Sequence, residues 1–242
     1  MQKYIAIVNP RMDNDEISRL IAQDIAGALF QINHQNYALA AKLVQQVKDL
    51  SRKQNKPVSV IQDVSEMLDP LDLEFGIRNG IDWVVVGDPA HIRLARRFNK
   101  SIPIIWKGQK LPHNLGLDSI MTKSISDPDA QIQDSPWQIQ HQVRPHVKEK
   151  ILAAIRDMAD HSHSSAIAVS DLEEAKTLSA MRPKQKIIYA PKDKTWAPRA
   201  SIFRGVHPVF AHGDLRSRQL VRQGERYVDA TDGKHVTIRL IT

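Results

Sequence analysis

The stretch Ile81-Asp82-Trp83-Val84-Val85-Val86-Gly87-Asp88-Pro89 decides how the chain is expected to fold. Its four consecutive apolar residues do not alternate between a core and solvent. They therefore favour a strand of a parallel sheet, buried on both faces. Gly87-Asp88-Pro89 is typical of the turn that starts a helix, with Asp88 as the capping residue. A strand followed directly by a helix is the repeating unit of an α/β protein.

The same alternation extends from this stretch across residues 1–123. We expect parallel strands joined by right-handed crossovers, about six of them, in a first domain of residues 1–123. The predicted strands are Tyr4–Asn9, Gly27–Asn33, Val58–Asp63, Asp82–Gly87, Ile102–Trp106 and Asp118–Lys123, and the predicted helices are Asp13–Ala26, Asn36–Arg52, Pro70–Asn79 and Ala90–Asn99.

A second α/β unit follows a segment without periodicity. Residues 124–146 are predicted to be a linker because Asp, Ser, Pro and Gln dominate its first part. Residues 147–242 form the second predicted domain, and Asp232-Gly233 indicates a hairpin between its last two strands. The predicted strands are Ala166–Val169, Ile187–Ala190, Val206–Phe210, Tyr227–Ala230 and Val236–Ile241, and the predicted helices are Val147–Asp160, Leu172–Arg182, Thr195–Phe203 and Asp214–Arg222.

Composition excludes several classes of protein. The 242 residues include no cysteine, which excludes disulfides and thiolate metal sites. No apolar run reaches the roughly 18 residues of a membrane span, and the N-terminal apolar run is too short for a signal peptide, so we expect a cytoplasmic protein. The net charge is +7, and residues 146–242 hold 17 Lys and Arg against 11 Asp and Glu, a net +6. This basic C-terminal part is a candidate surface for an anion or, less favoured, nucleic acid.

Four segments in residues 164–211 follow one another in a specific order. They are Ser164-Ser165-Ala166-Ile167-Ala168-Val169-Ser170, a helix ending in Met181-Arg182-Pro183, Ile187-Ile188-Tyr189-Ala190, and Phe203-Arg204-Gly205-Val206-His207-Pro208-Val209. This order resembles the C-terminal domain of pyruvate kinase, and segments such as Ile5–Pro10 and Val58–Asp63 are similar to barrel strands of that family. The resemblance implies an incomplete, about six-stranded TIM-barrel-like parallel β/α domain, followed by a pyruvate-kinase C-terminal-like α/β domain.

The resemblance also implies which residues carry function. Lys107 follows the fifth predicted strand, where the family has its catalytic lysine. Asn33 and Asp63 end the second and third predicted strands, and they are candidate ligands for the family's potassium ion. The metal ligands stay unknown because Gln109 stands where the family has a magnesium-binding glutamate, and glutamine is a poor substitute for a carboxylate at a hard cation.

Further departures from the family pattern suggest that the chemistry is lost. Gln31 and Gln35 replace an arginine and a serine, a second arginine is missing after Asp63, and the lid domain is absent. Because removal of one preorganised charged donor typically costs about 2.7–4 kcal/mol of transition-state stabilisation, we expect no useful phosphotransfer. The favoured hypothesis is a pyruvate-kinase-like protein that acts by binding or oligomerisation and needs no cofactor.

Two alternatives stay open. One is a residual magnesium- and potassium-dependent phosphotransferase that uses Lys107 with a relocated acid, Asp63 or Asp118. The other is an anion- or nucleic-acid-binding module in the basic C-terminal domain. An open parallel sheet leaves edges that another copy, a pyruvate-kinase-like partner protein or the 124–146 segment could cover, so we expect an oligomer.

Smaller features have ordinary structural explanations. His161 and His163 lie near Asp160 at a predicted helix end, with no evident third metal ligand. Ser170 and Glu173 have the spacing of a capping box. Because Asp171, Glu173 and Glu174 would repel phosphate, we expect no sugar-phosphate effector at that loop. A further candidate for binding an anion is the cluster of Lys192, Lys194, Trp196 and Arg199. A solvated loop is the simpler explanation for it.

Overall fold

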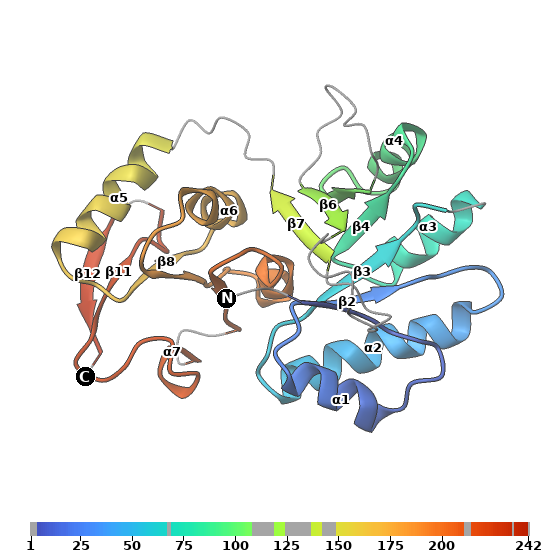
Figure 1. Ribbon diagram of the computed structural model, residues 1–242, viewed down its shortest axis with the longest axis horizontal. Helices are drawn as coiled ribbons and strands as arrows, with labels where there is room; N and C mark the ends of the chain where they lie inside the picture. Colours follow the sequence, from blue (N-terminus) through green and yellow to red (C-terminus); the bar gives the residue numbers. More distant parts are fainter. Residues whose placement is uncertain are drawn as a thin grey trace. The chain divides into compact units, whose positions relative to one another are not determined.

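The chain folds into two compact units, and the division between them in the sequence falls after residue 142. The computed structural model describes residues 4–66, 69–107, 119–123, 137–141, 149–210, 214–233 and 235–241. Each unit has its own β-sheet with helices packed on it (Figure 1). The expectation of an α/β protein with two sheets is therefore confirmed.

The first unit contains a sheet whose strand order follows the chain. Strands that are neighbours in sequence are neighbours in the sheet, and the first five pairs are all parallel. The sheet does not close into a barrel: among the described residues, β1 and β7 are its two edges. The strands are β1 (Ile5–Ile7), β2 (Gly27–Phe30), β3 (Ser59–Asp63), β4 (Trp83–Val86), β5 (Ile104–Trp106), β6 (Ser119–Lys123) and β7 (Trp137–His141).

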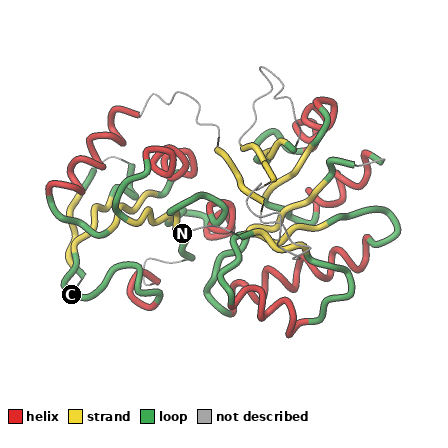
Figure 2. Tube along the Cα trace, viewed as in Figure 1, coloured by secondary structure: helices red, strands yellow, loops and turns green. Residues whose placement is uncertain are grey.

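Both faces of this sheet are buried. Val84 and Val86 pack in the core that the helices form with one face, and their exposed fraction is 0%. Ile61, Val85 and Ile105 point to the other face and are also 0% exposed. This burial on both faces is what the uninterrupted apolar run of β4 predicted. The helices of this unit are α1 (Asn14–Ala22), α2 (Tyr37–Lys53), α3 (Pro70–Arg78) and α4 (Pro89–Phe98), drawn in red with the strands in yellow in Figure 2.

Strand β7 lies within the segment that was expected to be a linker. It pairs with β6 in antiparallel register over five residue pairs, from Ser119 opposite His141 to Lys123 opposite Trp137. The sequence did not indicate this strand. By adding β7, the chain covers the free edge of β6 with part of its own 124–146 segment, which was one of the remedies considered for an open sheet.

The second unit is a mixed sheet in the order β10-β9-β8-β11-β12. Four strands are parallel, and β12 is antiparallel to β11. The hairpin predicted at Asp232-Gly233 is confirmed, and Gly233 has a φ of 71°, which favours glycine. The strands are β8 (Ala166–Val169), β9 (Lys186–Tyr189), β10 (Val206–Pro208), β11 (Arg226–Asp229) and β12 (Thr237–Leu240).

Two helices of the second unit end earlier than predicted, η1 at Ala200 instead of Phe203 and α7 at Ser217 instead of Arg222. The helices of this unit are α5 (Glu149–His161), α6 (Leu172–Met181), the 3-10 helix η1 (Lys194–Ala200) and α7 (Asp214–Ser217). The capping box expected at Ser170 is wrong. Asp171 caps α6 by accepting hydrogen bonds from the backbone N–H groups of Glu173 and Glu174. The Ser170 hydroxyl instead donates to the backbone oxygen of Thr231, at 2.6 Å.

No helix among the described residues is long and apolar enough to cross a membrane.

A glycine on α3 makes room for a buried amide of the first sheet. A Cβ at Gly76 would lie 1.9 Å from the side-chain oxygen of Gln62, which is 0% exposed. Gln62 cannot easily move, because its Nε2 donates to the backbone oxygen of Asp72 at 2.9 Å. We expect Gly76→Ala to lower the free energy of unfolding by about 1–3 kcal/mol, the usual range for overpacking a core. Urea denaturation measures this change.

The control is a double-mutant cycle with Gln62→Ala. Since Gln62→Ala removes the atoms that the new methyl group meets, the double variant should be less destabilised than the sum of the two single variants. Additive effects would contradict this explanation.

Candidate functional site

Two of the predicted site residues meet at the carboxyl edge of the first sheet. Asp63 ends β3, and Lys107 follows β5, with β4 lying between these strands. The Nζ of Lys107 lies 2.9 Å from Oδ2 of Asp63 and 3.2 Å from Oγ of Ser65. The other carboxylate oxygen of Asp63 accepts a hydrogen bond of 2.9 Å from the backbone N–H of Ser65. Lys107, Asp63 and Ser65 therefore form one polar cluster.

This cluster is partly withdrawn from water and tightly enclosed. The side chain of Asp63 is 6% exposed and that of Lys107 is 28% exposed. Between them, at the end of β4, a Cβ on Gly87 would lie 3.2 Å from the backbone oxygen of Ser65 and 3.4 Å from that of Lys107. A carboxylate with so little exposure depends on its cationic partner, because desolvation of an unpaired charge is costly.

Asn33 is not part of this cluster. Its side-chain oxygen accepts a hydrogen bond of 3.0 Å from the backbone N–H of Gln35, and its own backbone N–H donates to Asn36. These contacts are those of a residue that stabilises the turn between β2 and α2. Of the three predicted site residues, the structure brings together Lys107 and Asp63.

The described residues of this edge do not fit a bound magnesium or potassium ion. Both carboxylate oxygens of Asp63 are engaged, one by an ammonium group and one by a backbone N–H. Across the described part of the chain, no three His, Asp or Glu side chains gather in an arrangement that could hold a metal ion. The histidine pair considered from the sequence does not form such a group either. Nδ1 of His161 lies 2.7 Å from the backbone oxygen of Asp157. Gln109 and Asp118 lie outside the described residues.

A cavity lies at the carboxyl edge of the second sheet. Its volume is about 320 Å³, and segments that follow β8, β9, β10 and β11 line it. Because β9 and β11 lie on opposite sides of β8, the chain reverses direction across the sheet here, and α/β sheets commonly bind ligands at such a point. The lining residues are Ser170, Ala190, Pro191, Lys192, Lys194, Val209, Phe210 and Thr231.

The charged side chains in this lining are both cationic. Lys192 and Lys194 are exposed; Lys192 comes from the loop after β9, and Lys194 is the first residue of η1. Asp193 lies between them in the sequence, but its carboxylate caps η1 by accepting from the backbone N–H and hydroxyl of Thr195, at 3.0 and 2.8 Å. The hydroxyl hydrogen bond is the main reason that the pKa of Asp193 falls below its ordinary value. The cavity therefore combines a positive rim with hydroxyl groups.

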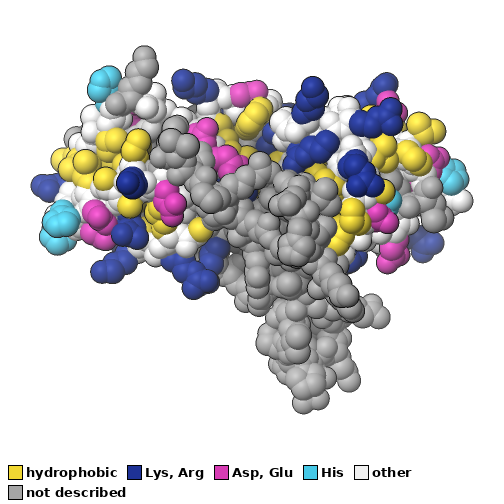
Figure 3. All heavy atoms as spheres, turned by 90° about the horizontal axis from the view of Figure 1, so that it is seen from above, with side chains coloured by type: hydrophobic (Ala, Val, Ile, Leu, Met, Phe, Trp, Pro, Cys, Tyr) yellow, Lys and Arg dark blue, Asp and Glu magenta, His cyan; other side chains and the backbone are white. Residues whose placement is uncertain are grey.

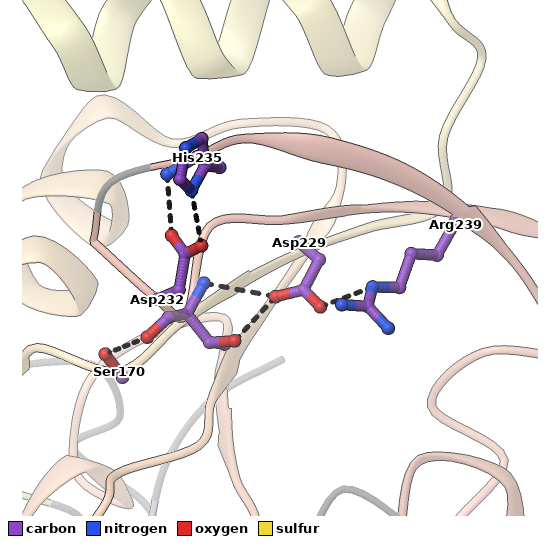
Figure 4. A network of polar contacts seen from close by, with 6 residues as sticks. Ser170, Asp229, Asp232, His235 and Arg239 are labelled. Atoms are coloured by element: carbon purple, nitrogen blue, oxygen red, sulfur yellow. Dashed lines mark hydrogen bonds and ion pairs between the residues drawn. The ribbon is translucent and has the colours of Figure 1, made fainter.

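A polar network links one wall of the cavity to the last strand (Figure 4). Oδ1 of Asp229 accepts from the backbone N–H and hydroxyl of Thr231, at 3.1 and 2.7 Å. Its Oδ2 lies 2.7 Å from Nε of Arg239 on β12. Asp229 is 5% exposed, so Arg239 compensates a buried charge and Thr231 is fixed beside Ser170. Burial, and secondarily the charge of Asp229, raises the pKa of Tyr227 in the same strand.

Sequence reasoning did not identify this cavity. Lys192 and Lys194 were noted as a basic cluster. Ser170 and Thr231 are hydrogen-bonded but lie 61 residues apart in the sequence, so no local pattern indicated that they would line the same cavity. The available clue was their common position just after predicted parallel strands, which places them on the same edge of a sheet.

No family model matches the chain, and no curated protein matches it. The likeness to pyruvate kinase therefore stays a prediction from the quoted segments.

The pair of Lys107 and Asp63 should contribute to stability more than an exposed ion pair does. We expect Lys107→Met to lower the free energy of unfolding by about 1–3 kcal/mol, because it leaves the carboxylate of Asp63 without its charged partner. The matched control is Arg78→Met, which breaks a pair with Glu74 in which the arginine side chain is 77% exposed. That change should cost at most about 1 kcal/mol. Equal losses in urea denaturation would contradict a special role for the buried pair.

Proposed function

We propose that this chain is a reduced pyruvate-kinase-like protein that does not catalyse phosphotransfer from phosphoenolpyruvate to ADP and acts by binding another protein. The partner is a second copy of the chain or a pyruvate-kinase-like protein. The observation that carries the proposal is the contact between Lys107 and Asp63 at 2.9 Å. The residue that would serve as the catalytic lysine is held by a carboxylate and a serine hydroxyl of its own sheet.

This contact matters because of what phosphotransfer requires. The reaction depends on cations that neutralise charge developing on the phosphoryl group and on carboxylates that hold the metal ions. Here the ammonium group of Lys107 is offset by Asp63, and both oxygens of that carboxylate are occupied. The two groups bind each other. The lysine therefore does not offer its charge to a substrate, and the carboxylate does not offer an oxygen to a metal ion.

The arrangement of the first sheet supports the relationship to a barrel. In a TIM barrel, consecutive parallel strands are also neighbours and their helices lie outside. Strands β1 to β6 follow that rule, and the core residues of α1 to α4 pack against one face. The open sheet fits an incomplete barrel that ends with an antiparallel strand.

The test is an assay of phosphotransfer coupled to lactate dehydrogenase, with magnesium and potassium present. We expect the wild-type protein to give no turnover above a blank without protein, and the Lys107→Ala variant to give the same rate. Clear turnover that Lys107→Ala abolishes would overturn the proposal in favour of a residual phosphotransferase. The mass of the protein in solution, alone and mixed with pyruvate kinase, then tests the binding role.

The cavity of the second unit favours a second candidate function, the binding of a small anion. Lys192 and Lys194 bring two positive charges to a space of about 320 Å³, a size suited to a small ligand. The acids of the neighbouring loop do not line it, and Asp171 is turned to the N–H groups of α6. On the face shown in Figure 3, Lys and Arg side chains are scattered over the surface rather than joined into one stripe, which favours a small anion over nucleic acid.

Titration with inorganic pyrophosphate, followed by calorimetry, tests this second candidate. We expect binding that Lys192→Gln combined with Lys194→Gln weakens at least roughly tenfold, since hydrogen bonds to charged groups contribute about 1.5–3 kcal/mol each. Lys184→Gln, an exposed lysine outside the cavity lining, is the control and should leave the affinity unchanged. No heat with the wild-type protein would exclude this function.

A further inference from the structure

The walls of the cavity in the second unit differ in chemistry from one side to the other. The strand order β10-β9-β8-β11 places the ends of β9 and β10 together on one side and the ends of β8 and β11 together on the other. The residues after β8 and β11 that line the cavity, Ser170 and Thr231, carry hydroxyl groups. The lining residues that directly follow β9 and β10 are all apolar: Ala190, Pro191, Val209 and Phe210.

The apolar side is held in place by the sheet and the core beneath it. The backbone N–H groups of Ala190 and Val209 donate to the last residues of β8 and β9, both at 2.9 Å. The side chains of Ala190 and Val209 are buried and belong to the same core cluster as Leu215 of α7, while Phe210 is half-buried. Because this wall needs no ordering when a ligand arrives, an apolar ligand group can be buried there at little entropic cost.

The hydroxyl groups on the other side already have their hydrogen atoms engaged. The hydroxyl of Ser170 donates to the backbone oxygen of Thr231 at 2.6 Å, and the hydroxyl of Thr231 donates to Oδ1 of Asp229 at 2.7 Å. A hydroxyl group has one hydrogen to donate and otherwise accepts through its lone pairs. These two groups therefore offer a ligand only lone pairs, which repel the oxygen atoms of an anion. An anion that filled the whole cavity would be opposed on this side.

The positive charge lies at the rim. Lys192 and Lys194 are exposed, and in the described part of the chain their ammonium groups have no ion-pair or hydrogen-bond partner. The carboxylate of Asp193, between them in the sequence, is directed to Thr195 instead. A lysine ammonium group is a compact charge on a flexible stem, which suits a phosphate or carboxylate group at the mouth of a cavity. The charged part of a ligand therefore belongs at the rim.

This cavity is distinct from the N-terminus of α6, where a sugar-phosphate effector was considered from the sequence. Figure 1 shows α6 and α7 on opposite sides of the sheet, and the apolar wall belongs to the core on the side of α7. Asp171, which accepts from the N–H groups of Glu173 and Glu174 at the start of α6, does not line the cavity. The acids that would repel a phosphate at α6 therefore do not act on this cavity.

We propose that the cavity binds a small organic phosphate or carboxylate with an apolar body, in preference to a sugar phosphate. The anionic group lies at the rim beside Lys192 and Lys194, and the apolar body lies against Val209 and Phe210. A sugar would place its hydroxyl groups against the apolar wall, where they would lose water without gaining hydrogen bonds. The volume of about 320 Å³ is at the lower end for ligand sites, which suits a body the size of one ring.

This inference names the ligand class for the anion-binding function proposed above and rests on that function. Calorimetric titration of the full chain with phenyl phosphate and with glucose 6-phosphate tests it. Both ligands carry the same phosphomonoester group, and their bodies are of similar size but differ in polarity. We expect phenyl phosphate to bind at least tenfold more tightly, because its ring removes apolar surface from water and needs no hydrogen bonds.

Two sets of variants separate the apolar body from the charged group. Phe210→Ala should weaken the binding of phenyl phosphate at least fivefold and leave the affinity for pyrophosphate unchanged. Lys192→Gln combined with Lys194→Gln should weaken the binding of both ligands. The matched control is Phe98→Ala, which removes a phenylalanine that is 37% exposed on α4 of the other unit and should change neither affinity. Circular dichroism shows whether each variant is folded, and the comparison of ligands on the wild-type protein needs no variant.

The ways in which the inference and the function beneath it can fail are different. If pyrophosphate binds but glucose 6-phosphate binds as tightly as phenyl phosphate, the ligand class is wrong and the anion-binding function stands. A folded Phe210→Ala variant that binds phenyl phosphate as the wild type does would also overturn the ligand class alone. If none of the three ligands gives heat with the wild-type protein, the anion-binding function fails and the inference fails with it.

Discussion

A β-strand at the edge of a sheet carries backbone N–H and C=O groups that must find partners, and this requirement runs through both units. In the first unit, β7 returns antiparallel to β6 and covers the last parallel strand. In the second unit, β12 does the same for β11. Both parallel sheets therefore end in an antiparallel strand. The difference is that β12 has two exposed apolar side chains, Ile238 at 48% and Leu240 at 56%.

Each unit also places a carboxylate at the end of a buried strand and compensates it with a cation from another strand or its end. Asp63 after β3 pairs with Lys107, and Asp229 at the end of β11 pairs with Arg239; both carboxylate side chains are 6% exposed. These pairs fix the ends of neighbouring segments, because a buried carboxylate without its cation is strongly unfavourable. In the first unit the pair occupies the residue that resembles a catalytic lysine. In the second it holds Arg239 of the last strand to Asp229 at the end of β11.

The sequence predicted the strands better than their ends and connections. The uninterrupted run Trp83–Val86 requires burial on both faces, and the structure has it in the middle of a parallel sheet. Strand β7 was missed because its alternating polar residues lie in a segment dominated by loop formers. The helix cap was placed one residue early, at Ser170 instead of Asp171, because both side chains can cap and only the backbone geometry distinguishes them. The cavity was missed because its lining comes from four separate segments.

The candidate site shows why residue type alone does not predict chemistry. Asp63 and Lys107 were each singled out by position, as a cation ligand and as a catalytic group. Their separation of 44 residues gave no sign that they would bind each other. In a parallel sheet, strands two apart bring their carboxyl ends close enough for a lysine to reach across the strand between them, provided that strand ends in a small residue. Gly87 supplies that residue, and a side chain there would meet the backbone of both Ser65 and Lys107. The same geometry that gathers catalytic groups in an α/β enzyme here lets a carboxylate and an ammonium group neutralise each other.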